Sequence, residues 1–175
     1  MRIVSFLAGL LLLLSSCTRD NRNLPGNVPG FRPVYSRDTT LHTIANKPAR
    51  DVASAGKIYV KGNYLFQNEI GEGIHIIDNT NPATAERVGF IRIAGSGEIA
   101  IRGNFLYSNN FDDLVVIDIS DIRNVREVRR IKNAFHQNNF QLAPPSRGYF
   151  ECVDKSRGTV IAWVADTLTN PSCIK

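Results

Sequence analysis

The chain has 175 residues, of which 43% are hydrophobic, and it carries a formal net charge of +5 at pH 7. This length is enough for one domain with a hydrophobic core. A positive balance can favour anionic lipid headgroups, lipopolysaccharide or nucleic acid. The basic residues are spread along the chain, however, and the local basic run 126–132 is interrupted by Glu127, Val128 and Ile131. Such alternation is typical of the solvated face of a strand, so we do not expect a nucleic-acid partner.

Residues 1–16 are predicted to be a signal peptide that forms a short leader helix. Arg2 supplies a positive start, and the apolar run 6–14 is far shorter than the ~20 residues that span a bilayer. Leu14-Ser15-Ser16-Cys17 then resembles the lipobox of bacterial lipoproteins, in which the leader is cut before a cysteine that becomes acylated. We therefore expect lipid, such as palmitate, on Cys17, where two or more acyl chains make a stable anchor. The alternative is an ordinary secretory signal with an incidental cysteine.

Thr18 follows the cysteine, where the inner-membrane retention signal of enterobacterial lipoproteins has an aspartate. We therefore expect a cell-envelope protein, an outer-membrane lipoprotein of a Gram-negative bacterium. The sequence leaves open whether it faces the periplasm or the cell surface.

Cys152 and Cys173 remain as a pair in a compartment where disulfides persist. A bridge between them would fix the end of the chain to the repeat domain; the alternative is two free, buried thiols. Neither cysteine has a histidine at a spacing typical of zinc sites or cysteine nucleophiles.

The range 17–34 is predicted to hold the lipid anchor site and a tether. Five prolines and glycines between 25 and 33 should interrupt any sheet ladder or helix. The range 38–51 has no clear period and is compatible with a short turn of helix or an outer strand.

Residues 57–93 and 98–131 are two copies of one unit, at a period typical of propeller repeats. Lys61-Gly62-Asn63-Tyr64-Leu65-Phe66 recurs as Arg102-Gly103-Asn104-Phe105-Leu106-Tyr107, and Gly73-Ile74-His75-Ile76-Ile77-Asp78 recurs as Asp113-Leu114-Val115-Val116-Ile117-Asp118. Each copy reads as four short antiparallel strands. The Gly62-Asn63 and Gly103-Asn104 pairs should form tight turns in which glycine and asparagine tolerate positive φ.

A third, partial unit is predicted over 147–175, within a repeat domain of 35–175. Gly148 to Cys152 matches the hairpin strand, and Thr159 to Trp163 matches the apolar strand. The fold class is therefore all-β: a partial β-propeller of about two clear four-stranded blades and a partial third.

The runs 74–82 and 114–121, each an apolar strand that ends in aspartate, resemble the LVIVD repeat. The stretch from about 57 to 131 is similar to lipidated LVIVD-repeat proteins of Bacteroidetes-type bacteria. The resemblance implies a β-propeller fold and no defined activity, since propellers host many functions.

A closed propeller has at least ~4 blades, more than this chain offers. Either several copies complete a ring of about six blades, or the chain is a shortened version of a longer protein. An open arc would leave strand edges and apolar blade faces exposed.

The candidates for chemistry are few, and we predict no catalytic, cofactor or metal residue. Asp78 and Asp118 could be read with Asn79, Asn81 and Asp121 as calcium ligands, but an Asx-type turn that fixes the strand exit is favoured. The three histidines, His42, His75 and His136, lie far apart in the sequence, and His75, which alternates within an apolar strand, is expected to be a packed or turn-bonded imidazole.

Two further features concern possible chemistry. Asp112 and Asp113 should point to opposite faces and make a poor acid/base pair. The loop segment 136–140, His-Gln-Asn-Asn-Phe, could hold a sugar or could be an ordinary solvated loop.

These observations predict a membrane-anchored, exported binding or scaffold module that contacts protein or glycan through its blade-connecting loops. The alternatives are a propeller-type enzyme with an axial site, which the apolar strands 74–77 and 114–117 do not favour, and a truncated remnant without independent activity.

Overall fold

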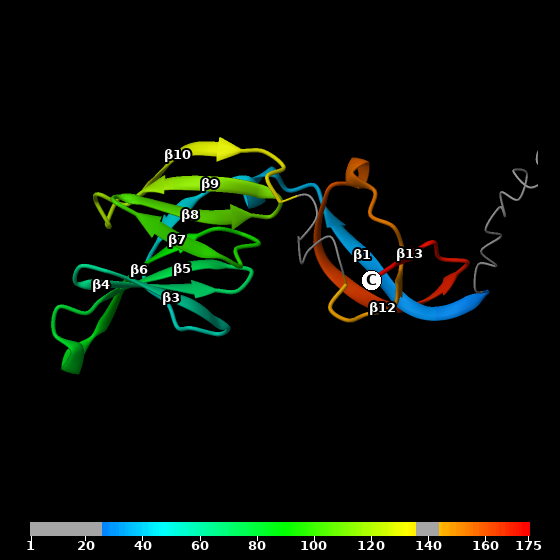
Figure 1. The fold of residues 1–175 in the computed structure, drawn as a ribbon, viewed down its shortest axis with the longest axis horizontal. Helices are drawn as coiled ribbons and strands as arrows, with labels where there is room; N and C mark the ends of the chain where they lie inside the picture. The colour runs from blue at the N-terminus through cyan, green and yellow to red at the C-terminus, as the bar shows by residue number, and fades with distance from the viewer. Residues whose placement is uncertain (1–25, 136–143) are drawn as a thin grey trace, which may run out of the picture.

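The computed structural model describes residues 26–135 and 144–175, which form three β-sheets (Figure 1). The predicted leader helix, the acylation site Cys17 and the loop segment 136–140 lie outside these residues. The helical elements within them are three short 3₁₀ helices, η1 (Thr39–His42), η2 (Pro82–Thr84) and η3 (Lys155–Arg157). No helix in this part of the chain is long and apolar enough to cross a membrane.

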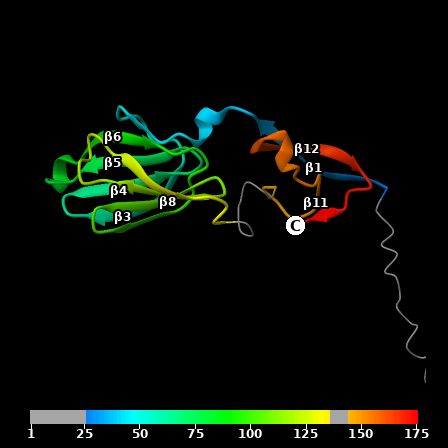
Figure 2. The same ribbon diagram turned by 90° about the horizontal axis from the view of Figure 1, so that it is seen from above.

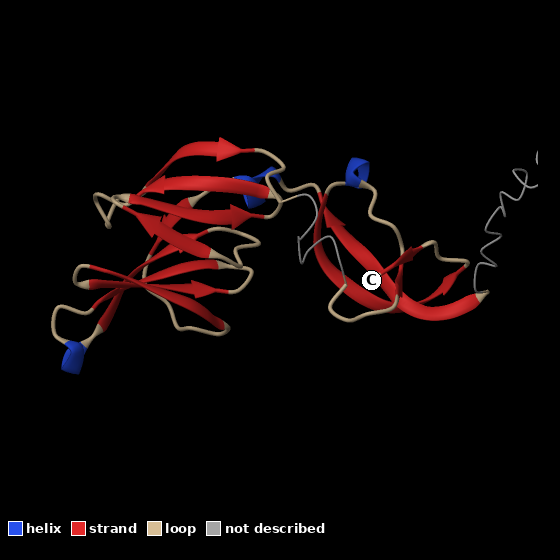
Figure 3. Cartoon of the chain, viewed as in Figure 1, coloured by secondary structure: helices blue, strands red, loops and turns tan. Residues whose placement is uncertain are grey.

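Two of the sheets are the predicted blades (Figures 1 and 3), which confirms the partial-propeller fold class. Blade 1 contains β3 (Ala55–Lys61), β4 (Tyr64–Glu69), β5 (Gly73–Asp78) and β6 (Glu86–Arg92), and β2 (Ala45–Lys47) adds a fifth strand beside β6. Blade 2 contains β7 (Ile99–Arg102), β8 (Phe105–Asn110), β9 (Asp113–Asp118) and β10 (Arg126–Ile131). Consecutive strands within each blade pair antiparallel.

The hydrophobic core lies between the two blades, and each blade contributes a different face. We call the face that carries Leu65 in blade 1 and Leu106 in blade 2 the front face, and the opposite face, with Phe66 and Tyr107, the back face. The core joins the back face of blade 1 to the front face of blade 2: its members include Phe66, Ile74, Ile76, Ile91, Leu106, Val115 and Ile117. The blades are therefore stacked head to tail, as successive blades of a propeller are.

The hairpin turns within each blade depend on glycine. Gly62 and Gly103 have φ values of +56° and +58°, and the asparagines that follow them are not among the described residues with positive φ. Positive φ at the first central position alone is the signature of a type II′ turn. Glycine is therefore the residue that takes positive φ in each predicted tight turn, and asparagine occupies the position that does not require it.

The third sheet has the strand order β12-β1-β11-β13. Its strands are β1 (Asn27–Ser36), β11 (Tyr149–Phe150), β12 (Thr159–Thr169) and β13 (Cys173–Ile174). From above (Figure 2), this sheet lies beside the two blades. The predicted third blade over 147–175 is corrected here: β11 and β12 are not neighbours, since β1 lies between them, antiparallel to β12 and parallel to β11.

The predicted tether over 17–34 is also corrected, because β1 begins at Asn27. Its prolines fit because of their register. The Phe31 carbonyl accepts a hydrogen bond from the Glu151 amide on the β11 side, and backbone groups two residues apart point the same way. The N–H groups that Pro29 and Pro33 lack would therefore point toward β11, where β1 has few pairs. The long ladder between β1 and β12 loses no hydrogen-bond donor.

The range 38–51, expected to hold a helical turn or an outer strand, holds both: η1 and the outer strand β2.

Candidate functional site

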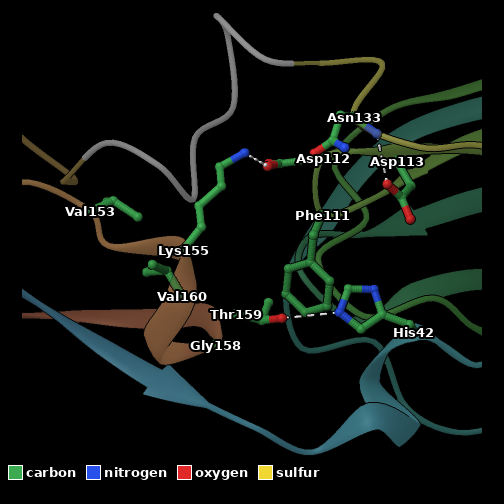
Figure 4. A pocket seen from close by; sticks show the side chains of 10 residues that line it. All are labelled: His42, Phe111, Asp112, Asp113, Asn133, Val153, Lys155, Gly158, Thr159 and Val160. Carbon is green, nitrogen blue, oxygen red and sulfur yellow. Dashed lines mark hydrogen bonds and ion pairs between the residues drawn. The ribbon is translucent and has the colours of Figure 1, made fainter.

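The candidate site is a cavity of about 280 Å³ between blade 2 and the third sheet (Figure 4). Its walls come from η1, the β8–β9 turn, the segment after β10, and the segment around η3. The lining residues are His42, Phe111, Asp112, Asp113, Asn133, Val153, Lys155, Gly158, Thr159 and Val160.

Phe111 forms the apolar wall on the blade side. The β8–β9 turn is one residue shorter than the Ile70–Glu72 turn of blade 1, and Phe111 has a left-handed φ of 54°. This conformation is uncommon for a bulky residue and costs about 1–3 kcal/mol. The ring is 6% exposed and lies 5.2 Å from the His42 ring, between centroids. The turn therefore holds the aromatic ring against η1.

His42 and Thr159 connect the two sides of the cavity. The His42 Nε2 atom lies 3.0 Å from the Thr159 hydroxyl, and Figure 4 shows this contact across the gap. A second connection is an ion pair, in which the Lys155 ammonium donates to Asp112 at 2.9 Å. Both contacts join blade 2 or η1 to the third sheet.

Asp113 faces another set of partners. Its carboxylate accepts hydrogen bonds from the Asn133 amide at 2.9 Å and from Arg130 at 2.9 Å. Burial disfavours the Arg130 charge, but hydrogen bonds to Glu127 and Asp113 outweigh this effect and raise the pKa of Arg130. Asp112 and Asp113 are thus engaged separately, and the structure does not bring them together as an acid/base pair.

Gly158 sets the approach of η3 to the cavity. Its φ is 125°, and a Cβ at this position would lie 2.4 Å from the Ser36 carbonyl oxygen. The chain can therefore pass this close to the end of β1 only with glycine here. Lys155 and Thr159, on either side, are thereby directed toward the cavity.

The cavity offers an aromatic wall and several hydrogen-bonding groups to a partner. Among residues 26–135 and 144–175, no group of three histidine, cysteine, aspartate or glutamate side chains is placed to hold a metal ion. The cavity combines one aromatic wall with donors and acceptors whose charges are largely balanced within ion pairs. Groups of this kind suit a small, neutral, hydroxyl-rich partner, since hydroxyls both donate and accept hydrogen bonds.

The predicted aspartates form Asx-type turns away from this cavity. Asp78 accepts hydrogen bonds from the Thr80 hydroxyl and amide, at 2.6 and 2.9 Å, and Asp118 accepts one from the Ser120 amide at 2.9 Å. These hydrogen bonds to Thr80 and Ser120 lower the pKa of both carboxyls. Each aspartate thus has a structural role at the exit of a central strand.

The structure places Cys152 and Cys173 in a disulfide bond. The bridge lies in the third sheet, where it joins the second residue after β11 to the first residue of β13.

Sequence reasoning missed a charged cluster around the buried Glu69 carboxylate, which we call the Glu69 cluster: Arg50, Glu69, His75 and Phe90. The Glu69 carboxylate accepts hydrogen bonds from Arg50 at 2.8 Å, from His75 Nε2 at 2.7 Å and from the Ala53 amide at 2.8 Å. Arg50 also lies over the Phe90 ring, 4.3 Å from its centroid.

Burial by itself would raise the pKa of Glu69. The Ala53 amide, Arg50 and His75 more than compensate and lower the pKa to about 2. His75 and Glu69 are fully buried, and the prediction of a packed His75 agrees with this. The Glu69–Arg50 pairing had no sequence signal, because Arg50 lies outside the repeat.

The geometry defines an all-β protein with two head-to-tail propeller-type blades and an added mixed sheet. Residues 53–89 and 95–132 match the family model described as the LVIVD repeat, which confirms this part of the predicted resemblance. Comparison with curated proteins and with solved structures gives no significant match.

Proposed function

We propose that this chain is a lipid-anchored, exported binding module of the bacterial cell envelope, held at the outer membrane through acylated Cys17. The observation that carries the binding role is the cavity between blade 2 and the third sheet. The β8–β9 turn of blade 2 supplies Phe111 and Asp112 to it, and η3 supplies Lys155 from the other side. The short apolar leader and the lipobox-like Leu14-Ser15-Ser16-Cys17 support the anchor.

A glycan end group is the ligand class that this cavity favours. The volume of about 280 Å³ is close to the lower limit for a small-ligand site and fits one sugar residue better than a peptide segment. His42 and Thr159 can exchange hydrogen bonds with sugar hydroxyls, and the Asp112–Lys155 pair offers both an acceptor and a donor.

The binding role is tested by titrating the purified chain with a panel of envelope glycans and following binding by calorimetry or on an array. Lys155→Ala removes a cavity donor that is 56% exposed and should weaken binding about tenfold, as expected for one charged hydrogen bond. Lys57→Ala is the matched control, because Lys57 is an exposed lysine that pairs with Glu98 away from the cavity. Equal affinities of the two variants, or binding by neither variant nor the parent, would contradict the proposed site.

The anchor is tested separately with Cys17→Ser in the producing cell. We expect the parent chain to incorporate labelled palmitate and to sediment with membranes, and the variant to do neither. A parent chain that carries no label would refute the lipid anchor and leave the cavity proposal to be judged by the titration.

A further inference from the structure

We infer that the front face of blade 1 binds the back face of blade 2 of a second copy of this chain, so that copies assemble head to tail. The inference does not depend on the proposed ligand. It rests on the interface within one chain, where the back face of blade 1 is already packed on the front face of blade 2.

The front face of blade 1 carries apolar side chains whose equivalents in blade 2 are buried by blade 1. Val60 is 62% exposed, while Ile101, at the same position of the next repeat, is 8% exposed. Leu65 and Ile77 are half-buried, and their equivalents Leu106 and Ile117 are fully buried. Ile58, at 56% exposure, extends the same strip. Blade 1 therefore has the residues of a blade interface without a preceding blade.

The back face of blade 2 shows the complementary pattern. Ile131 is 47% exposed, and its equivalent in blade 1, Ile91, is fully buried in the core. Phe105 is 43% exposed, whereas its equivalent Tyr64 packs against the core. This is the face that would cover the front face of a following blade.

The other half of each front face is covered in the same way in both blades, by a connecting segment. In blade 2, Asn110 and Arg130 donate hydrogen bonds to the carbonyls of Leu41 and His42. In blade 1 the equivalent positions are Glu69 and Phe90, and the segment that starts at Arg50 covers them. Within residues 26–135 and 144–175, the two front faces thus differ in one respect: blade 2 has a blade packed on its apolar strip, and blade 1 does not.

A polar contact at the edge of the interface between the two blades also has an equivalent on the exposed faces. Lys61 donates a hydrogen bond to the Asn104 side chain at 2.9 Å across the intrachain interface. The equivalents are Arg102 at the edge of blade 2 and Asn63 at the edge of blade 1, both exposed. Head-to-tail packing would bring Arg102 of one copy to Asn63 of the next with the same donor and acceptor chemistry.

Such an interface uses different surfaces on the two copies, so it forms a ring if the rotation closes and a filament if it does not. Two copies would supply four blades and three copies six, both within the typical range of about 4–8 for closed propellers.

The test uses two differently tagged full-length chains produced together, one with Asn63→Cys and the other with Arg102→Cys, treated with a bis-maleimide cross-linker. We expect a cross-linked species that carries both tags, and no dimer in cells that produce either variant alone. The parent chain, with Cys17, Cys152 and Cys173 in place, sets the background. A chain carrying both substitutions should give a ladder that stops at the number of copies in a closed ring.

Val60→Glu places a charge on the exposed strip and should reduce the mixed cross-link at least tenfold. Val164→Glu is the matched control, since Val164 is 48% exposed on β12 and lies on neither blade face, and it should leave the cross-link unchanged. Absence of the mixed species, a cross-link between two Asn63→Cys chains, or equal effects of the two glutamates would overturn the inference.

Discussion

Replacing Glu69 with glutamine tests whether the Glu69 cluster stabilises the first blade. The carboxylate is buried and accepts charged hydrogen bonds from Arg50 as well as one from His75. Glutamine keeps one acceptor oxygen but places an amide donor against these donors. Removal of one partner from a buried ion pair typically costs about 3–5 kcal/mol, and because Arg50 is 41% exposed we expect a cost at the lower end of this range.

The lowered pKa of Glu69 gives a second value for the stabilisation by its carboxylate and the pH range over which this stabilisation is lost. The pKa of Glu69 is about 2 in the folded chain against an ordinary value of 4.5, a difference that corresponds to about 3 kcal/mol. Because the folded pKa is lowered, this stability is fully present above pH 4.5 and is lost as the pH falls toward 2. Glu69→Gln cannot titrate, so the stability gap between parent and variant should narrow over this window.

The assay is urea unfolding followed by far-UV circular dichroism at a series of pH values. Glu72→Gln is the control, since Glu72 is 57% exposed and its contact with Arg50 is longer, 3.4 Å; its effect should stay below about 0.5 kcal/mol. A Glu69→Gln gap below about 1 kcal/mol at pH 7, or a gap that is unchanged between pH 7 and pH 2.5, would refute the reasoning.

Three further predictions concern the turns and the disulfide. Gly73→Ala should destabilise the chain by about 3 kcal/mol or more in the same assay, because φ is +152° and a Cβ would lie 2.1 Å from a β6 carbonyl oxygen. Gly97→Ala is the control: a Cβ there would lie 3.8 Å from its nearest neighbour, the Asn109 side-chain oxygen, and the substitution should cost less than about 1 kcal/mol. Replacing Cys152 and Cys173 together with serine should cost about 3 kcal/mol, as expected for a loop closed over 21 residues, and should speed proteolysis of the third sheet ahead of the blades; a uniform digestion rate would argue against this. Millimolar calcium should leave the Tm unchanged in the parent and in Asp78→Asn, because the Asp78 carboxylate is already engaged by Thr80, whereas a Tm increase seen only in the parent would restore the calcium interpretation.

The two blades could be predicted because their signals are local. Each unit repeats a turn glycine, an apolar strand and a terminal aspartate within about forty residues, and a second copy makes the pattern visible. Gly62 and Gly103, for example, lie in the same turn of the two units and have nearly the same φ. The turn chemistry and the alternation of the strands therefore follow directly from the sequence.

The third sheet and the cavity could not be predicted in the same way, because they depend on contacts between distant segments. The prolines of β1 are typical of a tether. They are compatible with a strand because Pro29 and Pro33 are four residues apart, so both point to the same side, and β1 is paired mainly on the other side. Phe111 becomes a cavity wall because one residue is missing from its turn and because η3 lies opposite. The role of Glu69 has no local signal, since its main partner, Arg50, lies in an aperiodic segment.

The position of β1 also constrains the order in which this chain can fold. Asn27 pairs with Thr169 and Ser36 with Thr159, so the first described strand has its longest ladder with nearly the last. Contacts this distant in sequence form slowly, because a long loop must close first. During synthesis the blades can assemble while β1 waits without its main partner, exposing strand edges on both sides. Loss of β12 would therefore leave β1 without its main partner, and a truncation that removes either of these two strands should have the same structural outcome.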